Sequence, residues 1–476
     1  MTTELTRIGE KARADSQCRF NALMHHVTDR GNLHTSFRGL KRNKAVGIDG
    51  VTKEDYAQNL DNNIKGLSGQ LARGSYKPQK TRRTTIPKAG SDKRRPLGIP
   101  CFEDKIVQKT VKNTLEHIYE ADFLSCSYGY RPGRSQHDAL DDIGRTIQQK
   151  KVSYIVEADI KGFFDSVNHE WLLRFLEHRI ADKRVIKLIQ RMLTAGTVME
   201  DGLVKADTEG TPQGSILSPL LSNVYLHYVL DLWFTKAFTQ QCRGEAHYFR
   251  YADDFIACFQ NKQDADMFMY ELRQRLEKFH LEVEETKTKS IEFGRFTQKN
   301  LDRTSKRDSK RSCKRRRKKC KAKDKSKVEG MRKSEHKRHK PATFDFLGFT
   351  HYCSVTRYGN FKVKRKTSRK KIRSKLKELN DWLKKVRSFR KKREIFRSAV
   401  SRARGHLNYY AITDNSPMCR VFLREFRRML FKWLNRQSQR RSYNWDTFTK
   451  ALEWYEWPPG RIKVKLCPFA KSSRRL

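Results

Sequence analysis

The feature that most constrains the fold of this chain is a pair of adjacent aspartates between two short apolar runs. The segment FRYADDFIACF (249–259) places Asp253 and Asp254 between strand-forming residues, which predicts a β-hairpin with two carboxylates at its tip. Asp is common in turns, so an isolated Asp-Asp pair would indicate ordinary turn chemistry. Tyr-Ala-Asp-Asp between two apolar strands is much rarer. Adjacent like charges on a tight turn also need compensation, which a divalent cation supplies.

A third carboxylate follows another predicted strand. SYIVEADI (153–160) is an apolar run in which Asp159 comes near the end. If Asp159 lies beside Asp253, the pair would create a two-metal site for activating a hydroxyl and stabilising a leaving pyrophosphate. The alternative is a helix cap. That alternative suits Asp165, because a helix is predicted over 168–180 with Asn168 as a further candidate cap.

A turn rich in glycine and proline precedes an apolar helix in EGTPQGSILSPLLSNVYL (209–226). Gly210, Pro212 and Gly214 predict the turn. Gln213 and the backbone N–H groups would then offer donors to a base pair or a phosphate. By itself such a loop is a weak signal.

The charge balance predicts a polyanionic partner. The chain has 103 Lys and Arg against 53 Asp and Glu, a net charge of +50. Nucleic acid is the expected partner, because each neutralised phosphate releases counterions. Solubility needs far less charge, and an anionic membrane surface is a weaker alternative. No apolar run reaches the roughly 20 residues that span a bilayer.

The N-terminal residues and the cysteines predict a cytoplasmic protein. The start, MTTELTRIGEKARADSQ, lacks the apolar core of a secretory signal. None of the ten cysteines forms a CxxC pair. We therefore expect reduced thiols rather than disulfides or a zinc site.

Patterning divides the chain into segments. Residues 1–75 are polar and helical in pattern, with a break at 47–51. RRTTIPK (82–88) and RRPLGIP (94–100) predict a hairpin that turns at Gly90 and Ser91, and their prolines indicate a sheet edge. FDFLGFTHYC (344–353) predicts one strand. Residues 365–440 predict a helical bundle with two apolar stripes: Ile372, Leu376, Leu379, Trp382 and Leu383, then Phe422, Phe426, Met429, Leu430, Trp433 and Leu434.

A strongly basic segment interrupts this pattern. Residues 299–340 contain 21 Lys and Arg against five Asp and Glu, with almost no apolar residues. The composition predicts a disordered or extended loop. Its charge favours a grip on RNA over an inert surface loop.

The order of these motifs resembles the palm of reverse transcriptases, and more specifically the proteins encoded by bacterial group II introns, which combine reverse transcriptase and maturase functions. The matching blocks run from about 45 to 460: GIDGV (47–51), IPK (86–88), RRPLGIP (94–100), DKIVQ (104–108), YGYRPGRSQHDAL (128–140), ADIKGFFD (158–165), GTPQGSILSPLLSN (210–223), YADD (251–254), LEVEETKTKS (281–290), FDFLGFTH (344–351) and LFKWLNRQSQRRSYNW (430–445).

The resemblance implies a fold and a division into domains. The expected fold class is α+β, a right-hand polymerase with fingers and palm, plus an all-α thumb. The expected domains are an N-terminal RNA-binding extension (1–75), fingers and palm with the basic insertion (76–362), a helical thumb or maturase domain (363–445) and a basic C-terminal tail (446–476).

The resemblance also implies residue roles. Asp159, Asp253 and Asp254 match the catalytic carboxylates that hold Mg²⁺, with the Ile160 carbonyl as a further ligand. Phe164 matches the aromatic gate that rejects a ribose 2′-hydroxyl. Nucleotide contacts are expected from Lys88, Arg95, Gln213 and Lys287. Arg94 is an alternative to Arg95. For Lys287, a solvated surface position without a role in binding is an equal alternative. Arg131 and Arg134 are expected on the template backbone, or else paired with a local carboxylate such as Asp138.

Two departures from the family pattern matter. No His follows His406, and only Cys419 and Cys467 lie beyond it, so we expect no HNH endonuclease, as in the shorter class C-like branch. The long insertion at 299–340 is the other departure. The expected partners are group II intron RNA, an RNA template, a DNA primer and dNTPs, with no membrane.

Rival functions remain open. A maturase that only binds RNA should have lost the metal carboxylates, and all three are present. A reverse transcriptase adopted for host defence, without an intron, would have the same palm, although the thumb sequence favours the intron protein. An RNA-dependent RNA polymerase is disfavoured by Phe164.

Overall fold

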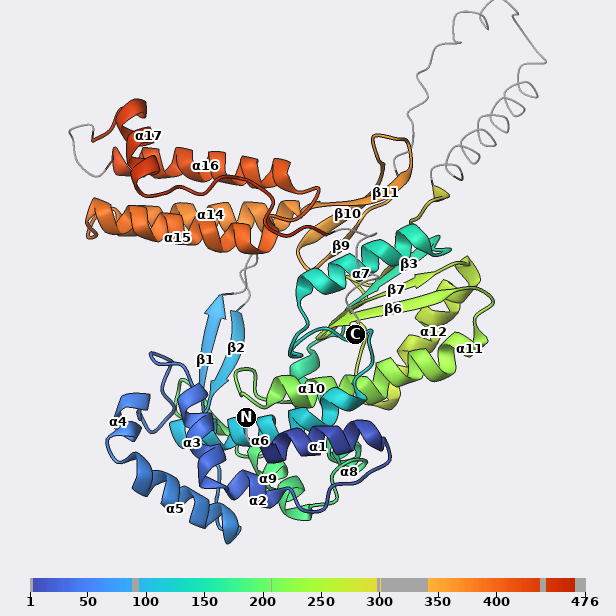
Figure 1. Ribbon diagram of the computed structural model, residues 1–476, viewed down its shortest axis with the longest axis vertical. Coiled ribbons are helices and arrows are strands. Elements are labelled where there is room, and N and C mark those ends of the chain that lie inside the picture. The colour runs from blue at the N-terminus through green and yellow to red at the C-terminus, as the bar shows by residue number, and fades with distance from the viewer. Residues whose placement is uncertain are drawn as a thin grey trace, which may run out of the picture.

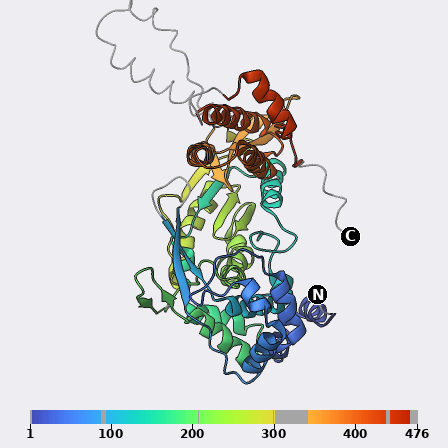
Figure 2. The same ribbon diagram turned by 90° about the vertical axis from the view of Figure 1, so that its left-hand side faces the viewer.

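The computed structural model describes residues 3–87, 94–206, 208–297, 300, 341–436 and 442–466. These residues form three hydrophobic clusters. Figure 1 shows N-terminal helices with a protruding hairpin, then a central sheet, then a helical bundle. The bundle lies at one end of the molecule and the N-terminal helices at the other (Figure 2).

The N-terminal region is helical, as predicted. Its helices precede and pack around one long helix, and they are α1 (Thr3–Ala14), α2 (Met24–Thr28), α3 (Arg30–Gly39), α4 (Lys53–Ala57), α5 (Leu60–Ala72) and the long α6 (Phe102–Asp122). Ile8, Leu33 and Val111 meet in one buried core. The predicted break at 47–51 is confirmed, because it lies between α3 and α4.

The predicted basic hairpin is confirmed. β1 (Thr81–Pro87) and β2 (Arg94–Ile99) are antiparallel, and β1 also pairs with β4 (Thr197–Val198), which pairs with β5 (Val204–Lys205). The edge position holds for β2 but is wrong for β1. β4 pairs only with Thr81 and Arg82, at the end of β1 away from Pro87, so the proline does not prevent it. The turn expected at Gly90 and Ser91 lies outside the described residues.

A four-stranded sheet in the order β6-β7-β3-β8 forms the centre of the molecule. Its strands are β3 (Tyr154–Ala158), β6 (Ala246–Tyr251), β7 (Asp254–Phe259) and β8 (Lys289–Glu292). Ile155 and Ile256 share a core with α7 (Gln136–Gln149), whereas Val156 and Ala257 share one with α12 (Lys262–Lys278). Successive side chains point to opposite faces, so β3 and β7 carry buried apolar side chains on both faces, because helices cover both.

Helices connect the strands of this sheet. They are the short 3₁₀ helix η1 (Phe163–Asp165), α8 (His169–Glu177), α9 (Lys183–Leu193), α10 (Ser218–Leu226), the π-helical turns η2 (His227–Asp231) and η3 (Phe234–Phe238), and α11 (Thr239–Gln241). Asn168 caps α8 by accepting a bond from the Trp171 N–H at 3.0 Å. Asp165 is not the cap. It ends η1, and its carboxylate accepts a bond from Gln213 Nε2 at 3.3 Å.

A three-stranded sheet in the order β11-β10-β9 leads into the bundle. The segment 344–353, predicted as one strand, is two: β9 (Phe344–Phe346) and β10 (Phe349–Val355). Leu347 and Gly348 both have positive φ, +48° and +80°, and this turn folds β10 back onto β9. The expected domain boundary at residue 363 falls inside β11 (Phe361–Thr367), which pairs with β10 along its whole length.

The C-terminal bundle consists of α14 (Arg369–Val386), α15 (Lys392–Tyr410), α16 (Ser416–Leu434) and α17 (Trp445–Trp454). Both predicted apolar stripes face its core, for example Leu379 from α14 and Phe426 from α16. Phe448 and Leu452 of α17 are buried in the same core. The segment predicted as a basic tail (446–476) therefore begins as a packed helix, because α17 has an apolar face that a sequence average hides.

Three expectations concern the chain as a whole. The cysteines within the described residues are free, as expected: Cys18, Cys101, Cys126, Cys242, Cys258, Cys353 and Cys419. Among the described helices, none combines the length and the apolar character that crossing a membrane requires. The basic insertion predicted at 299–340 lies outside the described residues except for Asn300.

Candidate active site

Asp253 and Asp254 lie at the tip of the β6–β7 hairpin, as predicted. Tyr251 pairs with Asp254, so Ala252 and Asp253 form a two-residue turn. Ala252 has a φ of +57°, as tight hairpin turns require to follow the twist of their strands. The hairpin thus holds both carboxylates at the end of the central strand β7.

The register of β3 brings Asp159 to the same place. Ala158 pairs with Phe255 in the antiparallel ladder, so Asp159, the residue just after β3, comes across from Asp254. The Asp159 carbonyl accepts a bond from the Glu284 N–H at 2.8 Å, which fixes the backbone there. The three aspartates, from segments almost 100 residues apart, line one cavity of about 610 Å³.

The cavity disfavours three bare negative charges. Burial raises the pKa of Asp253, and the nearby Asp159 carboxylate adds to the rise. The Asp254 side chain reaches the open cavity, yet burial of its surroundings together with the charges of Asp253 and Asp159 raises its pKa to about 7. Carboxylates that repel one another in this way form a place where a cation is favoured.

Four cationic side chains line the cavity: Arg95, Lys287, Lys370 and Lys371. Lys287 forms an ion pair with Asp159. Partial burial alone would lower the pKa of Lys287, but the hydrogen bond and charge of Asp159 raise it. Arg95 of β2 lowers the pKa of Asp253, and Lys371 of α14 lowers that of Asp254. The site therefore receives positive charge from the hairpin, the central sheet and the bundle.

The two arginines predicted as rivals, Arg94 and Arg95, lie on opposite faces of β2. Arg95 lines the cavity of the aspartates. Arg94 instead donates to the side chain and carbonyl of Thr85 on β1, at 2.7 and 3.2 Å. Neighbouring residues of a strand point to opposite faces, so only one of the two can face the aspartates. Lys88 lies outside the described residues.

The donor set of the cavity suits a hard divalent ion. Asp159, Asp253 and Asp254 offer carboxylate oxygens, which Mg²⁺ and Mn²⁺ prefer over nitrogen or sulfur. The Ile160 carbonyl is a further candidate oxygen. The isolated bridge between Ile160 and Val283 uses the backbone groups of the adjacent residues, Asp159 and Lys161, so it does not occupy that carbonyl.

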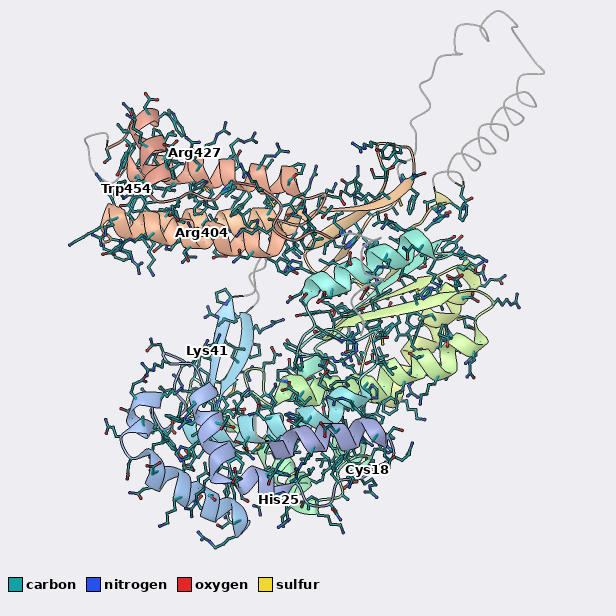
Figure 3. All side chains as sticks on the ribbon, viewed as in Figure 1. Cys18, His25, Lys41, Arg404, Arg427 and Trp454 are labelled. Carbon is teal, nitrogen blue, oxygen red and sulfur yellow. The ribbon has the colours of Figure 1, made fainter. Side chains whose placement is uncertain are left out.

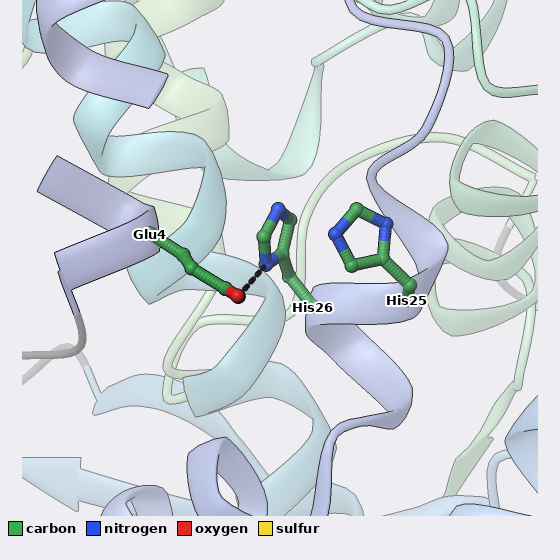
Figure 4. Close-up of side chains that lie close together, drawn as sticks. All are labelled: Glu4, His25 and His26. Atoms are coloured by element: carbon green, nitrogen blue, oxygen red, sulfur yellow. Dashed lines mark ion pairs between the residues drawn. The ribbon is translucent and has the colours of Figure 1, made fainter. Parts of the chain in front are cut away.

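A different group of potential ligands lies in the N-terminal helices (Figure 4). In the described ranges, the ligand atoms of Glu4, His25 and His26 lie within 4.8 Å of one another. The two ring centroids are only 3.7 Å apart, whereas rings whose nitrogens share one tetrahedral ion are separated by about 5 Å. His26 Nδ1 lies 3.6 Å from Glu4 Oε2. We interpret the group as a polar contact that joins α1 to α2.

Phe164 and Gln213 line a second, neighbouring cavity of about 350 Å³. β2 contributes to both cavities: Arg95 lines the cavity of the aspartates, and Pro96, Leu97 and Gly98 line the cavity of Phe164. The structure thus divides the predicted nucleotide-binding residues between two adjoining spaces. Phe164 is half-buried, with its ring at 5.4 Å from that of Phe163.

The loop over 209–217 is fixed by its own backbone. The Gly210 N–H donates to the Val167 carbonyl at 2.8 Å, and the Thr211 N–H donates to the Phe164 carbonyl at 2.7 Å. The expectation that backbone N–H groups here serve a nucleotide is therefore wrong for these two, because the loop uses them to bond η1 and the segment just after it. The Gln213 side chain, half-buried and bonded to Asp165, lines the cavity.

The template role expected for Arg131 is wrong. Arg131 is 8% exposed, and its guanidinium bonds Glu120 at 3.0 Å and the carbonyls of Leu124 and Ser127 at 2.8 and 3.0 Å. It has no surface left for a phosphate. Arg134 is half-exposed and donates to the Ser125 carbonyl at 2.8 Å, so its template role stays a prediction.

Residues that sequence reasoning missed also line the cavity of the aspartates. Lys370 and Lys371 come from the first turn of α14, Tyr130 from the loop before α7, and Tyr409 and Tyr410 from the end of α15. The two lysines stand in the run KRKTSRKK, where nothing distinguishes them from their neighbours. Only the packing of the bundle against the sheet identifies them.

A groove follows α15 on the bundle. Two cavities of about 720 and 710 Å³ share Arg397 and Ser401. Arg404 and the 83% exposed Trp454 border the first, and the 64% exposed Phe389 borders the second. Figure 3 shows Arg404 on the bundle helices and Trp454 at the far end of α17. Exposed aromatic rings beside arginines suit stacking on unpaired bases with contacts to phosphates.

Comparisons with known proteins bear on this geometry. Residues 86–351 match the family described as Reverse transcriptase (RNA-dependent DNA polymerase). The chain is 33% identical over 322 residues to protein YkfC of Escherichia coli K12, covering 60% of this chain and 83% of YkfC.

Several other relatives are named for introns. Group II intron-encoded protein LtrA of Lactococcus lactis subsp. cremoris is 37% identical over 232 residues, covering 48% of this chain but only 38% of LtrA. Nuclear intron maturase 1 of Arabidopsis thaliana mitochondria is 31% identical over 96 residues, or 20% of this chain and 13% of that protein. The chain thus spans well under two thirds of LtrA.

Proposed function

This chain belongs to the reverse transcriptase family, and from that premise we propose that it is an RNA-directed DNA polymerase of group II intron type that also acts as a maturase. The observation that carries the proposal is the convergence of Asp159, Asp253 and Asp254 on one cavity lined by Arg95 and Lys371. Fingers, palm and thumb correspond in this proposal to the N-terminal helices with the β1–β2 hairpin, the central sheet and the bundle.

In this proposal Mg²⁺ is the metal held by the three aspartates, with the Ile160 carbonyl beside them. When bound, such ions activate a primer 3′-hydroxyl and stabilise the leaving pyrophosphate. The protein side chains orient the reactants. Arg95 contributes a fixed positive charge beside Asp253 for the triphosphate. Lys287 holds the Asp159 carboxylate in place through its ion pair.

Selection of the sugar falls to Phe164 in the adjoining cavity. An aromatic ring beside the ribose position leaves no room for a 2′-hydroxyl, which would select dNTPs over ribonucleotides. Gln213 extends from the fixed loop to the same cavity, where its amide can contact the incoming nucleotide. η1 carries Phe164 and the loop carries Gln213. The bonds from Thr211 to Phe164 and from Gly210 to Val167, just after η1, therefore fix the two side chains relative to each other.

The maturase part of the proposal rests on a different surface. LtrA and the Arabidopsis maturase are named for introns, and the α15 groove offers this chain a matching RNA surface of arginines and exposed rings. We expect group II intron RNA to bind there and to the N-terminal helices, and RNA template with DNA primer to bind at the aspartates. A cytoplasmic location goes with this proposal.

Primer extension tests the polymerase. Purified protein should extend a DNA primer on an RNA template with dNTPs and Mg²⁺. The variant Asp253→Ala should lose this activity by about 10³-fold, while its affinity for template–primer stays near the wild-type value because only metal ligation is removed. Equal loss of activity and affinity would mean that Asp253 has a structural role.

Splicing tests the maturase. RNA transcribed from the locus of the gene should yield ligated exons and excised intron at low Mg²⁺ only when the protein is present, and Asp253→Ala should still support this reaction. Trp454→Ala should weaken RNA binding, whereas Tyr270→Ala, which removes another exposed ring on α12 (64% exposed), should not. Primer extension without any splicing would favour the host-defence alternative.

A further inference from the structure

Arg250, the residue before Tyr251 at the tip of the β6–β7 hairpin, is fully buried with 0% of its surface exposed. A guanidinium has five N–H donors, and all five are used. Two bond the Asp231 carboxylate, Nε at 2.7 Å and Nη2 at 2.6 Å. The others reach Asn223 Oδ1 at 2.9 Å, Ser127 Oγ at 2.8 Å and the Ala252 carbonyl at 3.0 Å.

A buried ion pair is weak support for stability, because losing hydration offsets the attraction between the charges. An apolar pair of similar volume would fill the same space. The exposed fraction of both side chains, Arg250 and Asp231, is 0%, so this pair bears that cost in full. The three Arg250 donors that do not bond Asp231 have partners that indicate a role for the pair other than stability.

Those partners surround the catalytic turn. Ala252, whose carbonyl Arg250 holds, has a φ of +57°, a conformation that is unfavourable for alanine and persists only when its surroundings impose it. On the other side the backbone of Gly129 presses against the turn, since a Cβ there would lie 2.4 Å from the Ala252 nitrogen. Asn223 Nδ2 donates to the Gly129 carbonyl at 2.7 Å.

These contacts form a closed circuit. Arg250 bonds Ala252 directly, and it bonds Asn223, which bonds Gly129, which packs on Ala252. Backbone hydrogen bonds also join Arg250 to the segment before Gly129. The Arg250 N–H donates to the Cys126 carbonyl, and the Tyr128 N–H donates to the Arg250 carbonyl. Asp231, which orients the guanidinium, ends the π-helical turn η2, and such turns often occur at functional sites.

We propose that the buried Arg250–Asp231 pair is the positioning device of the candidate active site, holding the Ala252–Asp253 turn in the conformation that lets Asp253 and Asp254 share metal ions with Asp159. The inference rests on the proposed function for its chemistry. Its geometry is independent of that function. Arg250 touches neither substrate nor metal and acts only through the turn.

The competing explanation is a core ion pair that supports folding alone. Arg179 and Asp122 provide a matched control, because they form a second ion pair with side chains only 3% and 13% exposed, at 3.1 Å. Arg179 holds the carbonyls of Ala12, Asp15 and Cys18, none of which lines the cavity of the aspartates. Loss of this pair should affect stability without affecting metal binding.

The first test measures Mn²⁺ binding to the protein without nucleic acid, from the electron paramagnetic resonance signal of free Mn²⁺. Asp253→Asn should abolish binding at the site. Arg250→Lys, which keeps the charge but loses the fork of donors, should weaken binding about tenfold, as is typical when a residue that orients a ligand is changed. Arg179→Lys should bind like the wild type.

Primer extension at varied Mg²⁺ gives the second readout. Arg250→Lys should lower kcat about 100-fold and raise the half-saturating Mg²⁺ concentration, with template–primer affinity unchanged. Asn223→Ala, which leaves the ion pair intact, should shift both quantities in the same direction by less, and it serves as the test if Arg250→Lys does not fold.

The outcomes separate the two proposals. Wild-type Mn²⁺ binding by Asp253→Asn would overturn the metal site and with it the proposed function. Loss of binding in Asp253→Asn with wild-type binding and Mg²⁺ dependence in folded Arg250→Lys and Asn223→Ala would overturn the positioning role alone. Equal effects of Arg179→Lys and Arg250→Lys on Mn²⁺ affinity would assign both pairs to general folding.

Discussion

Charge balance around Asp254 explains how three carboxylates share one cavity. Burial raises the pKa of Asp254 and the neighbouring Asp253 and Asp159 raise it further, while Lys287 and Lys371 lower it. Lys287 lies in the turn before β8, and Lys371 lies on α14. A divalent ion held by Asp159 would compete with Lys287 for that carboxylate.

Phe164 supports a prediction about sugar selection. Phe164→Ala enlarges the cavity that Phe164 shares with Gln213, so we expect ribonucleotides to be incorporated much more readily, with dNTP incorporation changed by less than about tenfold. Single-nucleotide extension with each dNTP and its ribonucleotide measures the ratio. Unchanged discrimination would refute the gate assignment.

His351 supports a prediction about acid stability. It is fully buried and stacks on Phe344 at 4.4 Å, and burial together with the charge of Arg365 lowers its pKa to about 3. The unfolded chain takes up a proton on this residue below its ordinary value of 6.5, whereas the folded chain does not. The free energy of unfolding should therefore fall by about 1.4 kcal/mol per pH unit below that value on account of His351 alone.

Comparison with His351→Phe isolates this contribution. Urea unfolding of both proteins between pH 7.5 and 5 should show a steeper decline for the wild type. His227 and His406, whose pKa values burial also lowers, are present in both proteins and cancel. Parallel curves would show that His351 is protonated in the folded protein.

At the level of elements, β2 and the loop over 209–217 are packed at backbone contact. Gly214 has a φ of +119°, and a Cβ on it would lie 2.6 Å from the Gly98 carbonyl oxygen of β2. The Gly98 N–H in turn donates to the Gln213 carbonyl at 2.7 Å. The strand that carries Arg95 is thus located by a loop more than 100 residues away.

Gly214→Ala should displace β2 from this loop and raise the KM for dNTPs about tenfold, because small shifts of binding groups weaken productive contacts. Gly202→Ala is the matched control. It has a φ of +83° but nothing within 4 Å of an added Cβ, so it should cost about 1 kcal/mol of stability and leave the KM unchanged. Steady-state extension and thermal unfolding of both variants make the comparison.

On the scale of the whole molecule, the cavity of the aspartates exists only because three parts of the chain meet. Arg95 comes from the hairpin, the aspartates from the central sheet, and Lys371 and Tyr410 from the bundle. The net charge of +50 surrounds these few acidic groups. Long-range attraction brings nucleic acid to the surface, and the local carboxylates bring metal ions to the point of reaction.

The basic insertion supports a prediction at this scale. Residues 299–340 carry 21 Lys and Arg against five Asp and Glu, so deleting them should flatten the dependence of RNA affinity on salt concentration, because fewer phosphates are neutralised. Affinities measured between about 50 and 200 mM salt give the slope. An unaltered slope would favour the inert-loop alternative.

Some of this protein could be predicted from local pattern. The hairpin at Asp253 and Asp254, the cap at Asn168 and the stripes at Leu379 and Phe426 depend on a few neighbouring residues, because turns and helical periodicity are local properties. Elsewhere tertiary packing decided the structure, and predictions from local pattern were wrong. The turn at Leu347 and Gly348 split an apparent strand, and α17 formed where a tail was expected.

The sequence alone thus determined that a strand end and a hairpin tip carry carboxylates within a strongly basic chain. Only the tertiary structure decided which cations face them. Arg95 rather than Arg94 lines the cavity because of strand pleat, Arg131 is buried on Glu120, and Lys371 arrives from the bundle. A cation's role depends on which carboxylates and carbonyls lie within about 4 Å, and for a long side chain that distance is set by packing between segments remote in sequence.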